Sequence, residues 1–342
     1  MKTKRIVVLG GGRQGRVVAS ELAPDYDVTV ADVRAMTFKG VTCREVDLAD
    51  AVAVEKLVGE FDLAVGALPA ELGYAAARAC VAARKSFVDV AFYPEDAATL
   101  HKDAKSAGVA IMPDCGLAPG ISNLLVGRAL AVRKPRELHI QVGGVAADRT
   151  RPFGYVVTWS LDDLVDEFRR PARIRRGGKV VTLPAMSELE PIDIPGVGTL
   201  EAFLTDGLRT LLDCDVPEMT EKTMRWPGHI AAIKPLLANG TLRQRLETEC
   251  REGDDLVAFR VQVDKEIVTM VERPQGGLSA MARTTALTCA AFARLAAEGG
   301  VRERGVVPPE RIGRDAEAYR FVLDAMAKHG ILLTPRYPFL DQ

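Results

Sequence analysis

The sequence lacks the features of a nucleic-acid-binding or membrane-spanning protein. Its 45 Lys and Arg residues nearly balance its 46 Asp and Glu residues, so the formal net charge is only −1. The strongly basic composition that is typical of a nucleic-acid binder is therefore missing. The first apolar run, which follows Arg5, is far too short to cross a bilayer. We expect neither nucleic acid nor a membrane among the partners, and we look for a small molecule instead.

The six cysteines are spread along the chain and form no Cys-x-x-Cys pair. Because a structural zinc ion needs clustered ligands, we expect no metal site. Scattered thiols without a recognisable secretory signal favour a reducing compartment, so we expect a cytoplasmic protein.

A glycine-rich turn between a strand and a helix is the clearest signal in the sequence. The β-branched run 5–9 leads into GGGRQG, which fits G-x-G-x-x-G, and a helical pattern follows. Gly10 allows a tight turn, Gly12 lets the backbone approach a pyrophosphate, and Gly15 lets the helix pack closely on the strand. A second strand over 27–31 then ends at Asp32. This order of elements predicts a dinucleotide site, although the glycines could also serve a turn alone.

The acid at the end of the second strand indicates which dinucleotide binds. Asp32 is placed to accept hydrogen bonds from a ribose diol, and its charge would repel a 2′-phosphate. We therefore predict NAD as the cofactor. Arg34 could meet a 2′-phosphate, so NADP remains the alternative.

Strands and helices continue to alternate up to residue 112. The patterns predict strands over 41–46, 61–65, 86–92 and 109–112, and helices over 51–58, 71–83 and 95–107. Repeated β-α units with short loops predict an α/β fold with a Rossmann, doubly wound parallel sheet. Ligands of such sheets bind at the carboxyl ends of the strands. The predicted cofactor-binding residues are therefore Gly10, Gly12, Arg13, Gln14, Gly15, Asp32, Asp47, Ala67, Leu68 and Pro69.

The middle of the chain has a different composition and predicts a second domain. We expect strands over 135–145 and 153–160, a strand-to-turn feature within 218–230, a hairpin over 172–184 that turns at Gly177-Gly178, and two antiparallel strands over 255–272. Helices are expected over 161–170 and 200–212. Ser279 is placed to cap a long helix over 280–297, and a last helix covers 315–328. We predict an NAD-binding domain of residues 1–120 and 279–342, into which an α+β substrate domain of residues 121–278 with a mixed or antiparallel sheet is inserted.

Six short motifs in order, GGGRQGR, PDCGLAPG, YVVTWS, DGLRTL, MRWPGH and SAMARTT, resemble the saccharopine dehydrogenase-like family over residues 4–297. The likeness is greatest to its L-lysine 6-dehydrogenase branch. This resemblance implies a Rossmann domain with an inserted catalytic domain. It also implies NAD-dependent oxidation of an amino acid side-chain amine, or of a secondary amine such as saccharopine.

The candidate catalytic residues are Asp114 and His229. Asp114 follows a strand end near the predicted nicotinamide and could bind the amine, or it could only cap the turn. His229 follows a Pro-Gly turn and could shuttle a proton or make a structural hydrogen bond. Cys115 is expected to line the nicotinamide pocket, because amine oxidation needs no covalent thiol.

The other candidate substrate residues would hold the ends of an amino acid. Arg209 and Arg225 could bind an α-carboxylate with their forked guanidinium groups, or they could carry surface charge. We place Thr210 in the same set. Tyr155 could line the aliphatic chain, or it could belong to the core.

We therefore expect oxidative deamination of L-lysine at its ε-carbon, which yields 2-aminoadipate 6-semialdehyde that can cyclise to piperideine-6-carboxylate. The alternative enzyme is a saccharopine dehydrogenase or a related carboxyalkyl-amine reductase. A third possibility is an NAD-sensing regulator without catalysis. We also expect a homodimer or a higher homo-oligomer.

Overall fold

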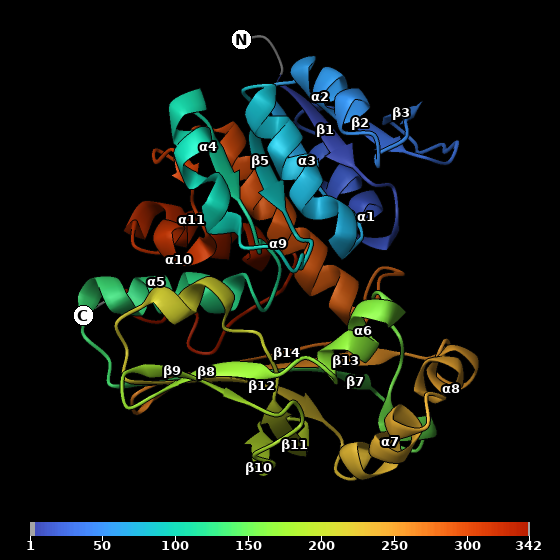
Figure 1. Cartoon of the computed structure of the whole chain (residues 1–342), viewed down its shortest axis with the longest axis vertical. Coiled ribbons are helices and arrows are strands. Elements are labelled where there is room, and N and C mark those ends of the chain that lie inside the picture. Colours follow the sequence, from blue (N-terminus) through green and yellow to red (C-terminus); the bar gives the residue numbers. More distant parts are fainter. Residues whose placement is uncertain (1–3, 341–342) are drawn as a thin grey trace. The chain divides into compact units, whose positions relative to one another are not determined.

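The computed structural model describes residues 4–340 and divides the chain into two compact units (Figure 1). Unit 1 comprises Met1–Gly127 and Thr284–Gly330, and unit 2 comprises Arg128–Arg283 and Ile331–Gln342. Within residues 4–340, no helix combines the length and the apolar character that a membrane span requires.

Unit 1 is built on a seven-stranded parallel sheet in the order β15-β6-β5-β4-β1-β2-β3. The first six strands thus have the spatial order 3-2-1-4-5-6 of a dinucleotide-binding fold. All strands are parallel, and it is the order of the strands along the sheet that reverses between β1 and β4. Strand β4 is buried along its whole length, as expected for a parallel sheet covered on both faces. The strands are β1 (Arg5–Leu9), β2 (Asp27–Asp32), β3 (Thr42–Glu45), β4 (Leu63–Gly66), β5 (Ser86–Asp89), β6 (Ala110–Met112) and β15 (Gly305–Val306).

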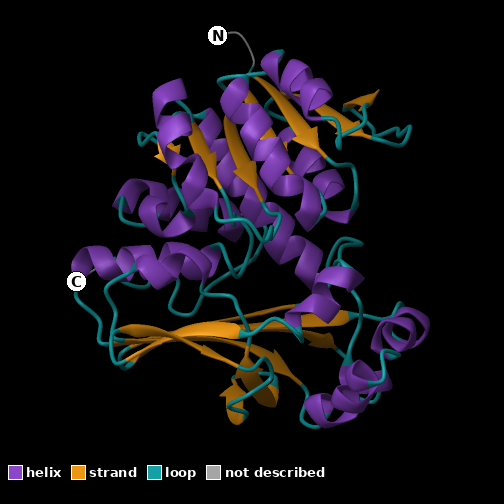
Figure 2. Cartoon of the chain, in the orientation of Figure 1, coloured by secondary structure: helices purple, strands orange, loops and turns teal. Residues whose placement is uncertain are grey.

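Helices flank the parallel sheet of unit 1 on both sides (Figure 2). Side chains of α2, α3 and α4 pack on one face around the fully buried Phe87 and Ile111. The predicted doubly wound fold is confirmed. The helices are α1 (Arg13–Leu22), α2 (Ala51–Gly59), α3 (Ala70–Ala82), the 3-10 helix η1 (Ala97–Leu100), α4 (His101–Ala107), α10 (Pro309–Ile312) and α11 (Ala316–Ala327), with α5 (Ile121–Val132) and α9 (Ala280–Ala297) crossing the unit boundary.

Unit 2 contains the predicted mixed sheet, in the order β10-β11-β12-β7-β13-β14. Strands β12 and β7 pair in parallel, and the other pairs are antiparallel. The hairpin β8–β9, of which β8 also pairs with β12, turns at Gly177 and Gly178, which have φ values of 57° and 76°. The strands are β7 (Glu137–Ala146), β8 (Ala172–Arg176), β9 (Lys179–Leu183), β10 (Glu190–Ile194), β11 (Gly198–Leu204), β12 (Glu218–Arg225), β13 (Asp255–Val263) and β14 (Glu266–Glu272).

Three helices of unit 2 enclose a second apolar core. Side chains of α6, α7 and α8 pack around Phe168 and Phe203, which are almost fully buried. Helices α7 and α8 and strand β10 have no counterpart in the predicted elements. The helices of this unit are η2 (Pro152–Gly154), α6 (Leu161–Glu167), η3 (Arg209–Asp213), α7 (His229–Ala238) and α8 (Leu242–Glu249), of which η2 and η3 are 3-10 helices.

Two predicted elements of unit 2 are wrong. Residues 153–160 are not a strand, because Phe153 and Gly154 adopt positive φ values of 57° and 59° that interrupt an extended chain. Residues 200–212 are not one helix but strand β11 followed by η3. Leu200, Leu204 and Leu208 fit a helical spacing, yet the first two lie in a strand that pairs with β10 and β12.

The unit boundaries also differ from the predicted domain boundaries. Residues 121–127 belong to unit 1, where the Asn123 amide donates to Glu310 Oε2 at 3.1 Å. Residues 331–342 belong to unit 2 instead of the nucleotide domain. Thr334 exchanges two backbone hydrogen bonds with Thr269 of β14, and this pairing joins the segment to the mixed sheet.

A buried carboxylate starts helix α9. Asp255, which is 1% exposed, accepts hydrogen bonds from the N–H groups of Ala280 (2.7 Å) and Met281 (2.8 Å). The Ser279 hydroxyl, as predicted, accepts the N–H of Ala282 at 3.1 Å. These bonds satisfy N–H groups that have no partner within the helix.

Asp255→Ala should lower the free energy of unfolding of unit 2 by about 1–3 kcal/mol, because two buried N–H groups lose their acceptor. Both tryptophans, Trp159 and Trp226, lie in unit 2, so urea unfolding followed by tryptophan fluorescence reports on this unit. Asp254, the exposed residue before Asp255, gives the control. Asp254→Ala should change the free energy of unfolding by less than about 0.5 kcal/mol. Equal effects of the two substitutions would contradict the capping role.

Candidate functional site

The glycine loop of unit 1 is shaped by close contact with the loop that follows β4. A Cβ atom at Gly10, where φ is 97°, would lie 2.5 Å from the Ala67 carbonyl oxygen. A Cβ at Gly15 would lie 1.8 Å from the Gly10 carbonyl oxygen. At Gly12, in contrast, a Cβ would meet no protein atom within 4 Å. Gly10 and Gly15 are therefore needed for the turn itself, whereas Gly12 faces open space at the start of α1.

Asp32 ends β2 beside this loop. Its carboxylate accepts hydrogen bonds from the Gly11 N–H (2.8 Å), the Arg34 N–H (3.0 Å) and Arg34 Nε (3.1 Å). Burial alone would raise the pKa of Asp32, but the bonds from Arg34 and Gly11 outweigh it and hold the pKa below its usual value. The group is thus ionised at neutral pH, and Oδ2, which accepts only the Gly11 N–H, can accept a further donor such as a ribose hydroxyl.

The remaining predicted cofactor residues lie in or next to loops at the carboxyl ends of β1, β3 and β4. Gln14 Oε1 is buried and has no hydrogen-bond partner among residues 4–340, and Arg13 is exposed. Asp47, after β3, accepts the Ala49 N–H at 2.9 Å. Ala67 and Leu68 follow β4, and Pro69 precedes α3. An uncapped α1 N-terminus, open space at Gly12 and an orphaned Gln14 oxygen together fit a bound dinucleotide.

Asp114 and Cys115 follow β6 in unit 1. Asp114 is 2% exposed and has a φ of 59°, an uncommon conformation for a residue other than glycine. The Cys115 N–H donates to the Asp89 carbonyl at 2.8 Å, which anchors this turn to the end of β5. Burial raises the pKa of the Cys115 thiol well above its usual value, so the group stays protonated and is a poor nucleophile.

In unit 2 the structure brings three predicted residues together. The guanidinium carbon of Arg225 lies 5.0 Å from the centre of the Tyr155 ring, and the His229 ring lies 5.9 Å from it. All three side chains are almost fully buried. The Tyr155 hydroxyl accepts the indole N–H of Trp159 at 3.0 Å, and burial raises the pKa of Tyr155 to about 12. We call Tyr155, Arg225 and His229 the tyrosine cluster.

His229 is neutral in this cluster. Burial and, secondly, the charge of Arg225 lower the pKa of His229 to about 3. Its Nδ1 lies 2.8 Å from the Phe153 carbonyl oxygen, which can only accept, so Nδ1 carries the proton. Nε2 then presents a lone pair, which is buried and has no partner in the described part of the chain. It could accept one hydrogen bond from a ligand, but burial opposes the imidazolium that a proton shuttle would require.

Arg225 also has unused donor capacity. One of its amino groups donates to the Met224 carbonyl at 3.0 Å, and another lies 3.9 Å from Glu167 Oε1. Its Nε is buried and has no hydrogen-bond partner within residues 4–340. A guanidinium with free donors is suited to bind a carboxylate.

Arg209 and Thr210 open the short helix η3 and are half-buried. Arg209 has a positive φ of 50°. The Thr210 hydroxyl is buried and lacks a hydrogen-bond partner within the described residues. Their predicted contact with substrate stays a prediction.

A polar network next to the tyrosine cluster was not predicted. It consists of Glu167, Thr205, Glu221 and Thr223. One signal in the sequence could have found half of it. Glu221, Thr223 and Arg225 alternate within the stretch 218–230, where a strand-to-turn feature is expected, and polar residues at every second position of a central strand share one face.

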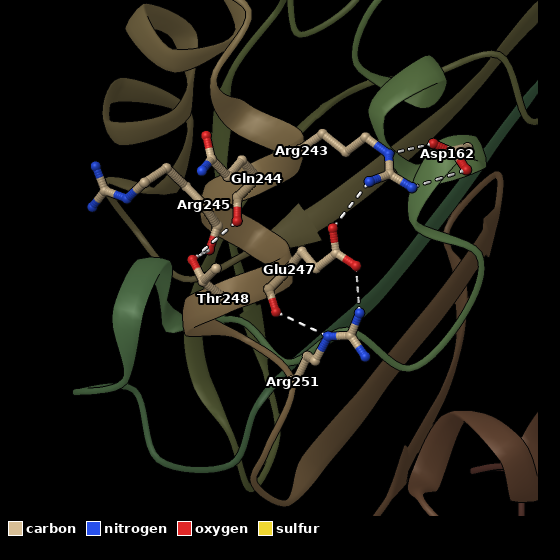
Figure 3. Close-up of polar contacts among 7 residues, drawn as sticks. All are labelled: Asp162, Arg243, Gln244, Arg245, Glu247, Thr248 and Arg251. Carbon is tan, nitrogen blue, oxygen red and sulfur yellow. Dashed lines mark hydrogen bonds and ion pairs between the residues drawn. The ribbon is translucent and has the colours of Figure 1, made fainter.

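Helix α8 supports the tyrosine cluster from the surface. Arg243 donates to Asp162 at 2.6 Å, and both Arg243 and Arg251 reach Glu247 (Figure 3). These exposed ion pairs contribute little stability individually. Arg245 lies over the Phe153 ring at 5.7 Å, and Phe153 supplies the carbonyl that orients His229.

No group of three or more His, Cys, Asp or Glu side chains within residues 4–340 is arranged to hold a metal ion.

Two family models match the chain. The Saccharopine dehydrogenase NADP binding domain matches residues 6–112, and the Saccharopine dehydrogenase C-terminal domain matches residues 116–251 and 239–331. The chain belongs to the saccharopine dehydrogenase family. The resemblance seen in the motifs is thereby confirmed at the level of the family, and the N-terminal match indicates a nicotinamide cofactor.

Curated relatives carry the name of this family or of a related synthase. The chain is 22% identical over 264 residues to "Saccharopine dehydrogenase [NADP(+), L-glutamate-forming]" of Saccharomyces cerevisiae, a match that covers 70% of the chain and 59% of the relative. It is 25% identical over 177 residues to "Alpha-aminoadipic semialdehyde synthase" of Arabidopsis thaliana, covering 48% and 16%. The matches thus cover less than two thirds of these relatives.

A solved saccharopine dehydrogenase shares the fold. The apo enzyme (L-Glu forming) from Saccharomyces cerevisiae aligns with a TM-score of 0.75 at 19% identity, covering 96% of this chain and 98% of that one. At this identity the likeness shows the fold of the family member and not its substrate.

Gly12→Ala should fold as the wild type does and lose dinucleotide affinity by about tenfold or more, because its methyl group would occupy the space in front of the loop. Gly15→Ala should instead lower the free energy of unfolding by about 1–3 kcal/mol, because its methyl group overlaps the Gly10 carbonyl. Circular dichroism during urea unfolding and a fluorescence titration with NADH separate the two effects. Full affinity in Gly12→Ala would contradict this cofactor site.

His229→Asn should make unit 2 less sensitive to acid. An imidazole with a pKa of about 3 when folded and 6.5 when unfolded stabilises the fold above pH 6.5 and loses this contribution as the pH falls. Between roughly pH 6 and 4, wild-type stability should fall by up to about 1.4 kcal/mol per pH unit more than that of the variant. Parallel curves of tryptophan-monitored urea unfolding would show that folding does not lower the pKa of His229.

Proposed function

We propose that this protein is an NAD-dependent amine dehydrogenase that oxidises L-lysine at its ε-carbon. The product imine takes up water and releases ammonia, which leaves 2-aminoadipate 6-semialdehyde. Membership of the saccharopine dehydrogenase family supports a dehydrogenase that acts on amino acid C–N bonds. The names of the relatives support a place in lysine metabolism.

One observation carries the substrate proposal. A buried arginine and a neutral histidine contact the same tyrosine ring, and each has a nitrogen without a hydrogen-bond partner among the described residues. Arg225 would bind the α-carboxylate through its free donors. The Tyr155 ring would lie along the aliphatic chain, and His229 Nε2 would accept one hydrogen bond from an amine. A lysine carries both groups that this arrangement can bind.

The cofactor would bind at the glycine loop of unit 1. Its backbone N–H groups and Gly12 would hold the pyrophosphate, and Asp32 would accept the ribose hydroxyls. A bound nicotinamide supplies an acceptor for hydride from the carbon that carries the amine. The ionised Asp32 supports NAD, although the matching family model is named for NADP.

The amine must lose a proton before oxidation, because its lone pair drives hydride departure. A lysine ammonium has a pKa of about 10.4, so its deprotonation costs roughly 4 kcal/mol at pH 7.5. We propose Asp114, a buried carboxylate of unit 1 with a positive φ of 59°, as a partner for an ammonium group.

Saccharopine dehydrogenase activity is the second candidate, because the curated relatives with similar sequences carry that name. Its substrate has more carboxylates and would need further basic side chains beside Arg225. A sensor that binds NAD without catalysis is the third.

The decisive assay offers the purified protein NAD or NADP with lysine, saccharopine or ornithine, and follows the absorbance of the reduced cofactor. We expect turnover with NAD and lysine. Turnover of saccharopine without turnover of lysine would support the second candidate, and tight NAD binding without any turnover would support the sensor. Asp114→Asn should reduce kcat by about 10²-fold or more and leave the NAD affinity unchanged. Near-wild-type turnover in this variant would exclude the role of Asp114.

A further inference from the structure

A chain of four oxygen atoms links two glutamates inside unit 2. Glu221 Oε2 lies 2.7 Å from Thr205 Oγ1, which lies 2.9 Å from Thr223 Oγ1, which in turn lies 2.5 Å from Glu167 Oε1. Thr205, Glu221 and Thr223 are each at most 5% exposed. The Glu167 side chain is 15% exposed and lies 3.9 Å from Arg225, so this end of the chain is the one beside the tyrosine cluster.

Counting protons shows that one carboxyl group must be protonated. Three contacts of hydrogen-bonding length need three protons, and the two threonine hydroxyls supply only two. If both carboxyls were ionised, the contact between the two hydroxyl oxygens would have no proton. The third proton therefore resides on Glu167 or on Glu221.

The surroundings favour Glu221 as the carrier. The charges that raise the pKa of Glu221 are those of Glu167 and Asp206, and Asp206 is paired with Arg173 at 2.9 Å. The Gly207 N–H donates to Glu221 Oε2 at 3.1 Å and lowers the pKa of Glu221, but burial outweighs this bond. On the same face of β12, Arg225 lies next to Glu167. Lys222, which points to the other face, pairs with Glu190. Burial raises the pKa of Glu221 to about 8, and the charge of Glu167 contributes to the rise.

We propose that Glu221 retains a proton at neutral pH and thereby orients the hydroxyls of Thr205 and Thr223, so that Glu167 is the ionised end of the chain and the acceptor for the substrate's proton. Glu221 donates to Thr205, Thr205 donates to Thr223, and Thr223 donates to Glu167. Glu221, Thr205 and Thr223 are positioning residues in this arrangement. The acceptor role rests on the proposed amine oxidation, whereas the retained proton does not.

The chemical step is a simple proton transfer. An N–H bond of the substrate ammonium breaks, its electron pair stays on nitrogen, and the proton forms an O–H bond with Glu167. The neutral amine then has the lone pair that oxidation requires, and the partly exposed Glu167 returns the proton to solvent. Glu167 is thus the proton acceptor. His229 is not suited to this role, because its burial opposes the charged form.

The retained proton is tested by the pH dependence of stability. A carboxyl with a pKa of about 8 when folded and 4.5 when unfolded stabilises the fold below pH 4.5, and this contribution is lost as the pH rises toward 8. Relative to Glu221→Gln, which resembles the protonated acid, the wild-type folding constant should fall by up to about tenfold per pH unit between roughly pH 5 and 8. Glu218→Gln, on the same strand, is the control and should follow the wild type.

Tryptophan-monitored urea unfolding of unit 2 provides these constants. Parallel curves for the wild type and Glu221→Gln would overturn the proposal. If Glu221→Gln does not fold, wild-type protein with ¹³C-labelled glutamate decides the question, because one glutamate carboxyl carbon should titrate near pH 8. The absence of any glutamate titrating above roughly pH 6.5 would overturn it equally.

The acceptor role is tested by breaking the chain at Thr205, which Thr223 separates from Glu167. Thr205→Val should lower kcat with lysine by about tenfold and shift the pH profile of kcat/KM, and Thr205→Ser should restore both. Wild-type kinetics in Thr205→Val would refute the acceptor role. A wild type that oxidises no amine would refute the proposed function, while the unfolding curves would still decide whether Glu221 holds its proton.

Discussion

Carboxylates bound by backbone N–H groups hold the important segments of both units in place. Asp32 ties the glycine loop to β2, and Asp255 starts helix α9. Glu221 approaches the Gly207 backbone so closely that a side chain there would overlap it. Each of these carboxyl groups, ionised or protonated, accepts N–H groups that would otherwise be buried without a partner, and that penalty keeps the backbone in one conformation.

The two units supply different electrostatic environments. In unit 1, N–H groups and Arg34 keep Asp32 ionised at the glycine loop, which suits neutral ribose hydroxyls. In unit 2, burial disfavours the charged forms of His229 in the tyrosine cluster and of Glu221 in the neighbouring network. Arg225 lies 3.9 Å from Glu167, and its Nε has no hydrogen-bond partner within residues 4–340.

Unit 1 followed closely from the sequence, and unit 2 followed less closely. Parallel β-α units repeat one local pattern. In the first turn, the positive φ of Gly10 and the close backbone contacts at Gly10 and Gly15 leave no room for a side chain, so glycine is required there. In unit 2, helical and strand spacing coincide over 198–212, so the local pattern could not distinguish β11 from a helix. The positive φ of Phe153 likewise does not follow from the strand-like pattern of 153–160.

Local pattern was sufficient for the Rossmann fold, the cofactor loop and the family, because each depends on residues that are close in the chain. It also singled out Tyr155, Arg225 and His229 as separate candidates. Their contact needed the folded unit, since sheet pairing and three packed helices bring together residues that lie up to 74 positions apart. The proton count between Glu167 and Glu221 depends on the three distances that join four side-chain oxygens. Those oxygens come from residues far apart in the chain, so only the folded unit brings them together.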